Sequence, residues 1–126
     1  MKKLTKAEEE LMLILWRLKE ALVRDIIAEL DNSETPYTTV STIIRILEKK
    51  GFVSHKAYGN THLYFPLVSK KAYSRTQLKD FVSNYFNGSF SSMATFFAKE
   101  SDVSIEELKE ILSEMEKELQ QKQENE

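Results

Sequence analysis

The residues best suited to chemistry in this sequence are the short hydroxyls and cations of residues 35–51, TPYTTVSTIIRILEKKG. At helical spacing, the apolar stripe of this segment consists of Val40, Ile43, Ile44 and Leu47. The opposite side and its flanks carry Thr38, Thr39, Ser41, Thr42, Arg45 and Lys49. Short hydroxyls let a helix approach another surface closely, and in a DNA major groove they bond phosphates or base edges. The alternative is a solvent-facing helix that is simply rich in threonine.

Two predicted helices come before this segment. Thr5 and Glu8 have the spacing of a capping box, which predicts a helix from there to about Lys19. A second apolar stripe predicts a helix over residues 22–30. We expect the third helix to have Thr35 as its N-cap and Gly51 just after its end. Two short helices joined by a brief polar turn favour a helix-turn-helix.

The segment after Gly51 changes period and predicts a β-hairpin. Its residues FVSHKAYGNTHLYFPLV are rich in aromatic and β-branched types, and Gly59-Asn60 is typical of a two-residue turn. With that turn, Ala57 lies opposite His62 and His55 opposite Tyr64. The other face should be buried and consists of Phe52, Leu63, Phe65 and Leu67.

Three helices followed by a hairpin is the element order of a winged helix. The hairpin tip would then be a wing that lies along the DNA phosphates, and its candidate contacts are His55, Lys56 and Asn60. The alternative is a hairpin that is merely solvated.

The distribution of charge supports a nucleic-acid-binding face. The whole chain has a net charge of −2. Residues 36–71, however, hold 6 Lys/Arg against 1 Asp/Glu, a net of +5, whereas residues 72–126 hold 6 against 11, a net of −5. Positive charge is therefore gathered on the third helix and the hairpin.

The C-terminal part predicts three more helices and a surface for self-association. A capping box at Ser104 and Glu107 opens the last helix, and the polar tail should be frayed. So short a unit buries too little surface alone, which favours dimerisation. The alternatives are packing against the N-terminal half, or a small-molecule pocket among the aromatics. The candidate dimerisation residues are Phe81, Tyr85, Phe86, Phe90, Phe97, Leu108, Leu112, Met115 and Leu119.

Several function classes lack support in the sequence. There is no cysteine, no P-loop and no triad-like arrangement, so we expect no enzyme and no cofactor. His55 and His62 lack a third ligand nearby, so no metal site is predicted. The apolar run after Leu11 is short and has no cleavage site behind it, which argues against a signal peptide or a membrane span. We expect a cytoplasmic protein.

The sequence resembles the penicillinase-repressor (BlaI/MecI) family of bacterial transcriptional repressors over nearly its whole length. The segments that carry the resemblance are LTKAEEELMLILW, DIIAEL, TTVSTIIRILEKKGFVSHKAYGN and FAKESDVSIEELKEIL. The resemblance implies an N-terminal winged helix, a C-terminal three-helix dimerisation unit, and a homodimer on a palindromic operator. Thr39 and Thr42 match the recognition helix of the family most directly.

Two departures from the family pattern concern regulation. Members of the β-lactam pathway are inactivated by cleavage between Asn and Phe, whereas the aligned pair here is Phe96-Phe97. The missing Asn argues against protease-triggered derepression and against β-lactam sensing, and the sequence identifies no upstream protease or effector. Copper-responsive relatives use a cysteine cluster, which this chain lacks.

These observations predict a mainly α protein with a small β-hairpin wing. Residues 1–70 would form a winged helix-turn-helix domain that binds DNA, and residues 71–126 a helical dimerisation domain. The predicted function is sequence-specific repression of transcription by a homodimer on a palindromic operator. The alternative is a winged-helix module that binds another protein.

Overall fold

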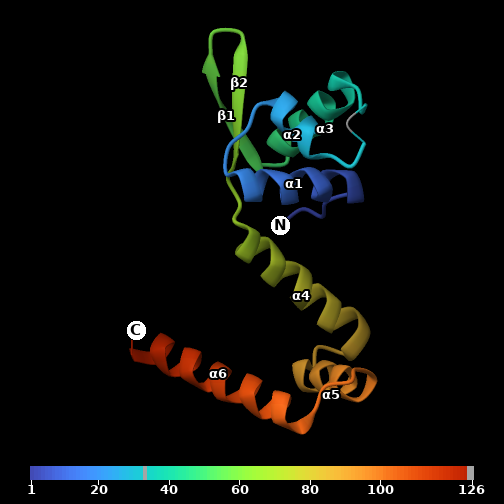
Figure 1. Cartoon of the computed structure of the whole chain (residues 1–126), viewed down its shortest axis with the longest axis vertical. Helices are drawn as coiled ribbons and strands as arrows, with labels where there is room; N and C mark the ends of the chain where they lie inside the picture. Colours follow the sequence, from blue (N-terminus) through green and yellow to red (C-terminus); the bar gives the residue numbers. More distant parts are fainter. Residues whose placement is uncertain (33, 125–126) are drawn as a thin grey trace. The chain divides into compact units, whose positions relative to one another are not determined.

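The computed structural model describes residues 1–32 and 34–124, which fall into two compact units, Met1–Leu78 and Lys79–Glu126. The first unit contains the elements α1 (Lys6–Leu18), α2 (Val23–Glu29), α3 (Tyr37–Lys49), β1 (Val53–Tyr58) and β2 (Thr61–Pro66) (Figure 1). Helix α4 (Lys70–Phe86) begins in the first unit and ends in the second, which also contains α5 (Phe90–Glu100) and α6 (Ile105–Glu124). The predicted fold class, mainly α with a hairpin wing, is confirmed.

Helix α1 starts at the predicted capping box and supplies much of the core. Thr5 Oγ1 accepts from the Glu8 backbone N–H at 3.2 Å, and Glu8 Oε1 accepts from the Thr5 N–H at 2.8 Å. Met12 and Leu15 on this helix are almost completely buried. They pack in one cluster with α2 and α3, which also includes Ile26, Val40, Ile44 and Leu47.

Helix α3 ends as predicted but starts differently. Its N-cap is Pro36, not Thr35 as expected, because the Thr35 hydroxyl donates instead to the Asn32 carbonyl at 2.6 Å. At the other end, Gly51 has φ +85°, and the Phe52 N–H donates to the Leu47 carbonyl at 2.9 Å. This is a Schellman motif, in which the left-handed residue is at C′. It sends the chain directly from α3 into the hairpin.

The hairpin has the predicted register, but the prediction of its buried face was wrong. His55 pairs with Tyr64 and Ala57 with His62 around the Gly59-Asn60 turn. Tyr64 is 4% exposed, whereas Leu67 is 58% exposed and Leu63 and Phe65 are half-buried. Tyr64 is covered because its backbone forms two hydrogen bonds with Ala21, in the connection between α1 and α2, at 2.8 and 2.9 Å. Of the four residues expected on the buried face, only Phe52 is fully buried.

The first unit also includes the start of α4, which is attached to α1. Trp16 Nε1 donates to the Val68 carbonyl at 2.8 Å, and the Tyr73 hydroxyl donates to Glu9 Oε2 at 2.9 Å. The rings of Trp16 and Tyr73 are 5.6 Å apart. The predicted domain boundary, at residue 70, coincides with the first residue of α4, while the compact unit continues to Leu78.

The second unit is helical throughout its described length, apart from short connections. Asn87 and Gly88 both have positive φ and end α4, and Ser89 caps α5. Ser104 Oγ accepts from the Glu107 N–H at 3.1 Å at the start of α6. The tail, residues 120–126, was expected to be frayed, but α6 continues to Glu124; residues 125 and 126 lie outside the described residues. No helix in the described ranges is long and apolar enough to cross a membrane.

Candidate nucleic-acid interface

Helix α3 presents most of the predicted polar residues on one exposed face. Thr38, Thr39, Thr42, Arg45 and Lys49 are all exposed, while Val40, Ile44 and Leu47 hold the helix to the core. Thr42 Oγ1 donates to the Thr38 carbonyl at 2.8 Å, so its hydroxyl is already bonded to the backbone of its own helix. The first turn contains no acidic residue. The exposed face of α3 therefore presents short hydroxyls and two cations, Arg45 and Lys49.

Ser41 does not belong to this exposed face, contrary to expectation. Ser41 is only 7% exposed. Position 41 lies beside Val40 and Ile44 on the helix surface, and Ser41 and the hairpin residue Tyr64 line one recess there. The serine side chain therefore lines this recess and is not part of the exposed face of α3.

The wing is attached to α3 through His55. His55 Nδ1 lies 2.5 Å from Oε2 of Glu48, and the His55 ring stacks on that of His62 with centroids 4.2 Å apart. Glu48 is the single acidic residue in the basic segment 36–71, and this contact draws it toward the wing. His55, a predicted DNA contact, is thus half-buried and already bonded on one ring nitrogen.

The two remaining wing candidates are exposed. Lys56 extends over the Phe65 ring, with Nζ 5.7 Å from the ring centroid. Asn60 is in the exposed hairpin turn. In the described chain, no three His, Cys, Asp or Glu side chains form a group that could hold a metal ion.

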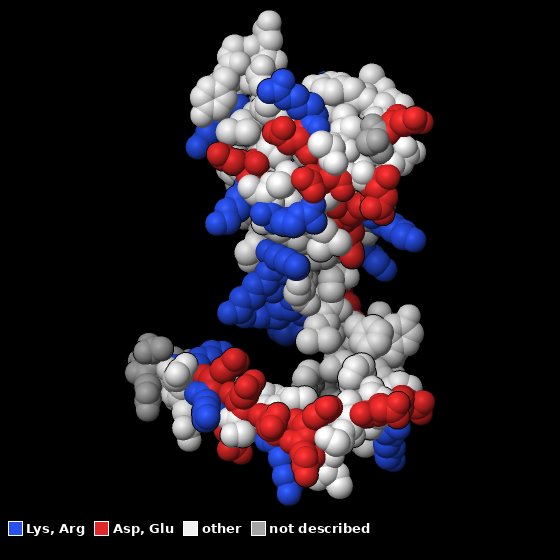
Figure 2. All heavy atoms as spheres, in the orientation of Figure 1, with Lys and Arg blue, Asp and Glu red and all other residues white. Residues whose placement is uncertain are grey.

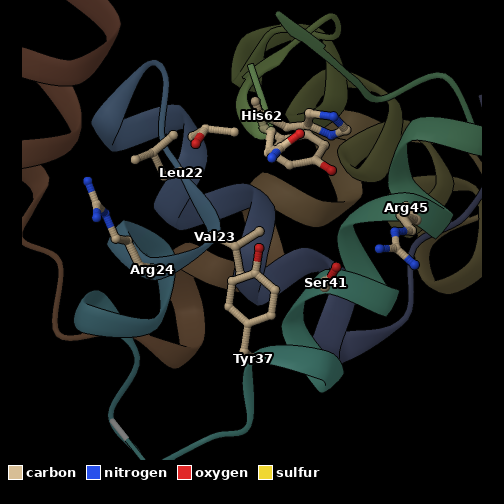
Figure 3. A pocket seen from close by; sticks show the side chains of 10 residues that line it. Leu22, Val23, Arg24, Tyr37, Ser41, Arg45 and His62 are labelled. Atoms are coloured by element: carbon tan, nitrogen blue, oxygen red, sulfur yellow. The ribbon is translucent and has the colours of Figure 1, made fainter. Parts of the chain in front are cut away.

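A polar recess of about 300 Å³, called here the wing recess, lies between α2, α3 and the hairpin (Figure 3). Figure 3 shows Arg24 and Arg45 on opposite sides of the recess, with the rings of Tyr37 and His62 between them. Its lining comprises Leu22, Val23 and Arg24 from the α2 side, Tyr37, Ser41 and Arg45 from α3, and Asn60, Thr61, His62 and Tyr64 from the hairpin.

The pKa of the Tyr64 phenol depends on the charged side chains around this recess. Burial raises the pKa of Tyr64, and the nearby carboxylate of Glu48 raises it further. The positive charge of Arg45 acts in the opposite direction, which places both side chains within electrostatic reach of this phenol.

Sequence reasoning missed three residues at this surface: Tyr37, Arg24 and Ile46. Tyr37 is 59% exposed although it continues the apolar spacing 37, 40, 44, 47, because it lies at the end of the helix, beyond the core. Ile46 is exposed between Arg45 and Leu47. Arg24 reaches the recess only through the folding of α2 beside α3, and no local pattern signals that.

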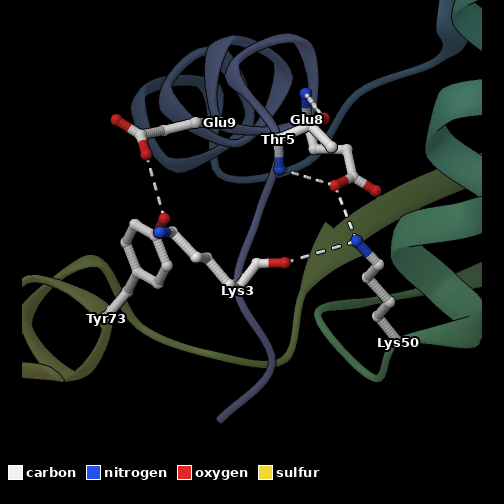
Figure 4. A network of polar contacts seen from close by, with 6 residues as sticks. All are labelled: Lys3, Thr5, Glu8, Glu9, Lys50 and Tyr73. Atoms are coloured by element: carbon white, nitrogen blue, oxygen red, sulfur yellow. Dashed lines mark hydrogen bonds and ion pairs between the residues drawn. The ribbon is translucent and has the colours of Figure 1, made fainter. Parts of the chain in front are cut away.

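The far end of α3 is held by a polar network (Figure 4). Lys50 Nζ lies 2.7 Å from Glu8 Oε1 and 3.4 Å from the Lys3 carbonyl. The network joins the end of α3 to the start of α1, and so holds α3 against the core.

The second unit exposes most of the predicted dimerisation residues. Phe81, Phe86 and Tyr85 cluster at the end of α4, and Phe86 also contacts Phe96 of α5. Figure 2 shows Asp and Glu side chains along α6. The predicted residues that are exposed are Phe81, Tyr85, Phe90, Phe97, Leu112, Met115 and Leu119, while Phe86 and Leu108 are half-buried. The pair Phe96-Phe97 lies inside α5, with both side chains exposed.

The order of three helices and a hairpin, with an exposed polar face on the third helix, defines a winged helix-turn-helix protein. The sequence profile of the penicillinase repressor family matches residues 4–117. The chain belongs to this family.

Curated relatives match over most of their length. The methicillin resistance regulatory protein MecI of Staphylococcus aureus (strain N315) is 32% identical over 114 residues, covering 87% of this chain and 93% of that protein. The penicillinase repressor of Bacillus licheniformis is 28% identical over 120 residues, covering 94% and 93%.

Two solved structures resemble part of the chain. The DNA-binding domain of the repressor BlaI shares 30% identity, with a TM-score of 0.49, over 58% of this chain and 94% of that one. The CopR repressor shares 32% identity, with a TM-score of 0.45, over 54% and 100%.

Proposed function

We propose that this chain represses transcription by binding, as a homodimer, an operator of two-fold symmetry in double-stranded DNA. The observation that carries the proposal is the exposed face of α3, which presents threonines and Arg45 on a helix held firmly by its apolar stripe. The relatives named as a regulatory protein and a repressor support the same role.

In this proposal each exposed residue has a chemical role. Arg45 contacts guanine, because its planar fork can donate to O6 and N7 together. Thr38, Thr39 and Thr42 contact base edges or thymine methyl groups. Lys49, Lys56 and Asn60 bind phosphates and position the protein on the duplex.

His55 has a conditional role. Its Nδ1 is already paired with Glu48, so its other ring nitrogen donates to a phosphate only when the imidazole is protonated.

Homodimerisation would come from the second unit. The exposed aromatic and aliphatic side chains of α4, α5 and α6 are more than a small helical unit normally leaves in water. Two copies that bury these faces together would hold two recognition helices at a fixed separation. Half-sites about one DNA turn apart would then be read together.

The test is selection of bound duplexes from a random DNA pool by the purified full chain. A variant carrying Thr39→Ala, Thr42→Ala and Arg45→Ala is selected in parallel. We expect the wild type to enrich a two-fold symmetric site and the variant to enrich none. Enrichment of nothing at moderate salt would reject sequence-specific repression and favour the protein-binding alternative. Binding that does not weaken as salt rises would also count against DNA contact, because phosphate binding releases counterions.

A further inference from the structure

The wing recess is lined by cations that have no anionic partner of their own. Neither Arg24 nor Arg45 forms an ion pair within residues 1–32 and 34–124; the ion pairs there are Arg17–Glu29, Lys50–Glu8 and His55–Glu48. The carboxylate closest in sequence to Arg45, Glu48, is engaged by His55. Two arginines that form no ion pair in this part of the chain therefore line one small recess.

The rest of the lining supplies hydrogen-bond donors. Tyr37, Ser41 and Thr61 bring hydroxyls, and Asn60 brings an amide. Tyr37 is also the first residue of α3, whose positive dipole end is capped by no side chain of the described residues. At about 300 Å³ the recess is at the small end of ligand pockets, which span roughly 300–1,000 Å³ and are mostly apolar. A small polar recess lined by two arginines and several hydrogen-bond donors suits a compact anion better than an apolar ligand.

We propose that the wing recess binds a phosphate group, and that in the working protein this is a backbone phosphate of the bound duplex. The recess is bounded by α3 on one side and the wing on the other, and these are the two elements that carry the candidate DNA contacts Arg45 and Asn60. A strand that follows both elements passes over the recess between them. The claim that the phosphate belongs to a DNA duplex rests on the proposed function. The claim that the recess binds a phosphate group does not.

The first experiment pairs a protein variant with a DNA modification. Arg24→Gln and Tyr37→Phe are made in the full chain, with Arg17→Gln as a control, since Arg17 is an exposed arginine of the same unit outside the recess. Binding is measured to duplexes in which one phosphate at a time is replaced by an uncharged methylphosphonate. We expect Arg24→Gln to weaken binding to the unmodified duplex about tenfold, as for loss of a charged hydrogen bond. A plot of the logarithm of the association constant against the logarithm of the salt concentration has a negative slope, and its magnitude should decrease by about 0.9.

The diagnostic result concerns one phosphate in each half-site, where the effects of Arg24→Gln and of the methylphosphonate on the binding free energy should not add. There, the methylphosphonate should weaken the wild type and Arg17→Gln about tenfold, but should leave Arg24→Gln almost unchanged. If the two effects add at every phosphate, the bound phosphate does not come from the duplex.

The second experiment separates the site from its source and needs no DNA. Inorganic phosphate is titrated at constant ionic strength against chloride, while the amide NMR signals of Tyr37 and His62 are followed. One outcome is that phosphate causes saturable shifts that disappear in Arg24→Gln, while the effects of Arg24→Gln and of the methylphosphonates add at every position of the duplex. The recess would then be assigned to a free phosphorylated molecule. Shifts no larger than those with chloride, together with additive duplex effects, would overturn the phosphate site. If the wild type binds no duplex, the proposed function fails, and this titration alone decides the phosphate site.

Discussion

Lys50 Nζ donates to Glu8 Oε1 across 2.7 Å, and this contact joins the C-cap of α3 to the first turn of α1. The Glu8 side chain is 5% exposed and that of Lys50 is 23% exposed. Burial alone would raise the pKa of Glu8, but the hydrogen bonds from Lys50 and Thr5 outweigh it, so the pKa is lowered. The ion pair is therefore a stabilising contact that also holds the end of α3 against α1.

Replacing Glu8 should destabilise the fold and change its acid sensitivity. Because the folded pKa of this carboxyl lies below its ordinary value of 4.5, its contribution is complete above that pH and is lost as pH falls through the folded pKa. We expect Glu8→Gln to lower the free energy of unfolding by about 1–3 kcal/mol at pH 7. The deficit should shrink on acidification. Urea unfolding at pH 7 and pH 3 measures both effects, and Glu10→Gln, at an exposed position, serves as control. A deficit that is equal at both pH values would contradict the linkage.

Tyr73 should make the first unit sensitive to alkali. Burial, together with the hydrogen bond to Glu9, raises the pKa of this phenol to about 12, from an ordinary 10.0. The stabilisation is therefore complete below pH 10 and is lost as pH rises through 12. We expect Tyr73→Phe to lower the stability by about 1 kcal/mol at pH 8. It should also lose less stability than the wild type between pH 9 and 11, measured by thermal unfolding. Parallel curves for the two proteins would refute this assignment.

Gly51 should be required for the backbone that ends α3. With φ at +85°, any side chain there is strained, although an added Cβ would meet nothing within 4 Å. We expect Gly51→Ala to cost about 1 kcal/mol of stability, and Gly51→Asn less, because asparagine tolerates the left-handed region better. Chemical unfolding of the three proteins tests the order. Equal costs for alanine and asparagine would show that the backbone angle is not the cause.

Arg45 and Lys49 should affect DNA binding in different ways. Arg45→Ala should relax specificity at one base pair of each half-site, with a loss of about 1–3 kcal/mol of discrimination. Lys49→Ala should weaken binding to all sequences alike and reduce the salt slope by about 1. Competition between the selected site and its single-base variants distinguishes the two effects. A loss of discrimination with Lys49→Ala alone would reverse the assigned roles.

Charges on the apolar stripe of α6 should separate the dimer. Leu112→Glu with Met115→Glu adds two negative charges where both side chains are exposed and would face a partner. Lys117→Gln with Lys122→Gln changes the net charge equally on the same helix and serves as control. Light scattering after size exclusion should report a monomer for the first variant only, with the winged helix still folded by circular dichroism. A monomeric wild type would contradict the homodimer directly.

Features that depend on neighbouring residues could be predicted from the sequence. The Thr5–Glu8 capping box, the Gly51 end of α3 and the Gly59-Asn60 turn each arise from hydrogen bonds or dihedral preferences within a few residues. The hairpin register followed from the turn in the same way. Helix positions were close for the same reason, because apolar spacing is a local property of the chain.

Features that depend on distant partners could not be predicted in this way. Both faces of the hairpin carry apolar or aromatic groups, so alternation alone could not show that Tyr64 is the buried one; its backbone pairing with Ala21 settles that, over 43 residues of chain. Ser41 is buried on the flank of α3 that lines the wing recess together with Tyr64, which the helical spacing did not indicate. The wing recess exists because α2 brings Arg24 beside Tyr37 and the hairpin. Periodicity determines which face of an element is apolar, but only long-range packing determines which surfaces meet, since the energy lies in contacts that the local chain does not contain.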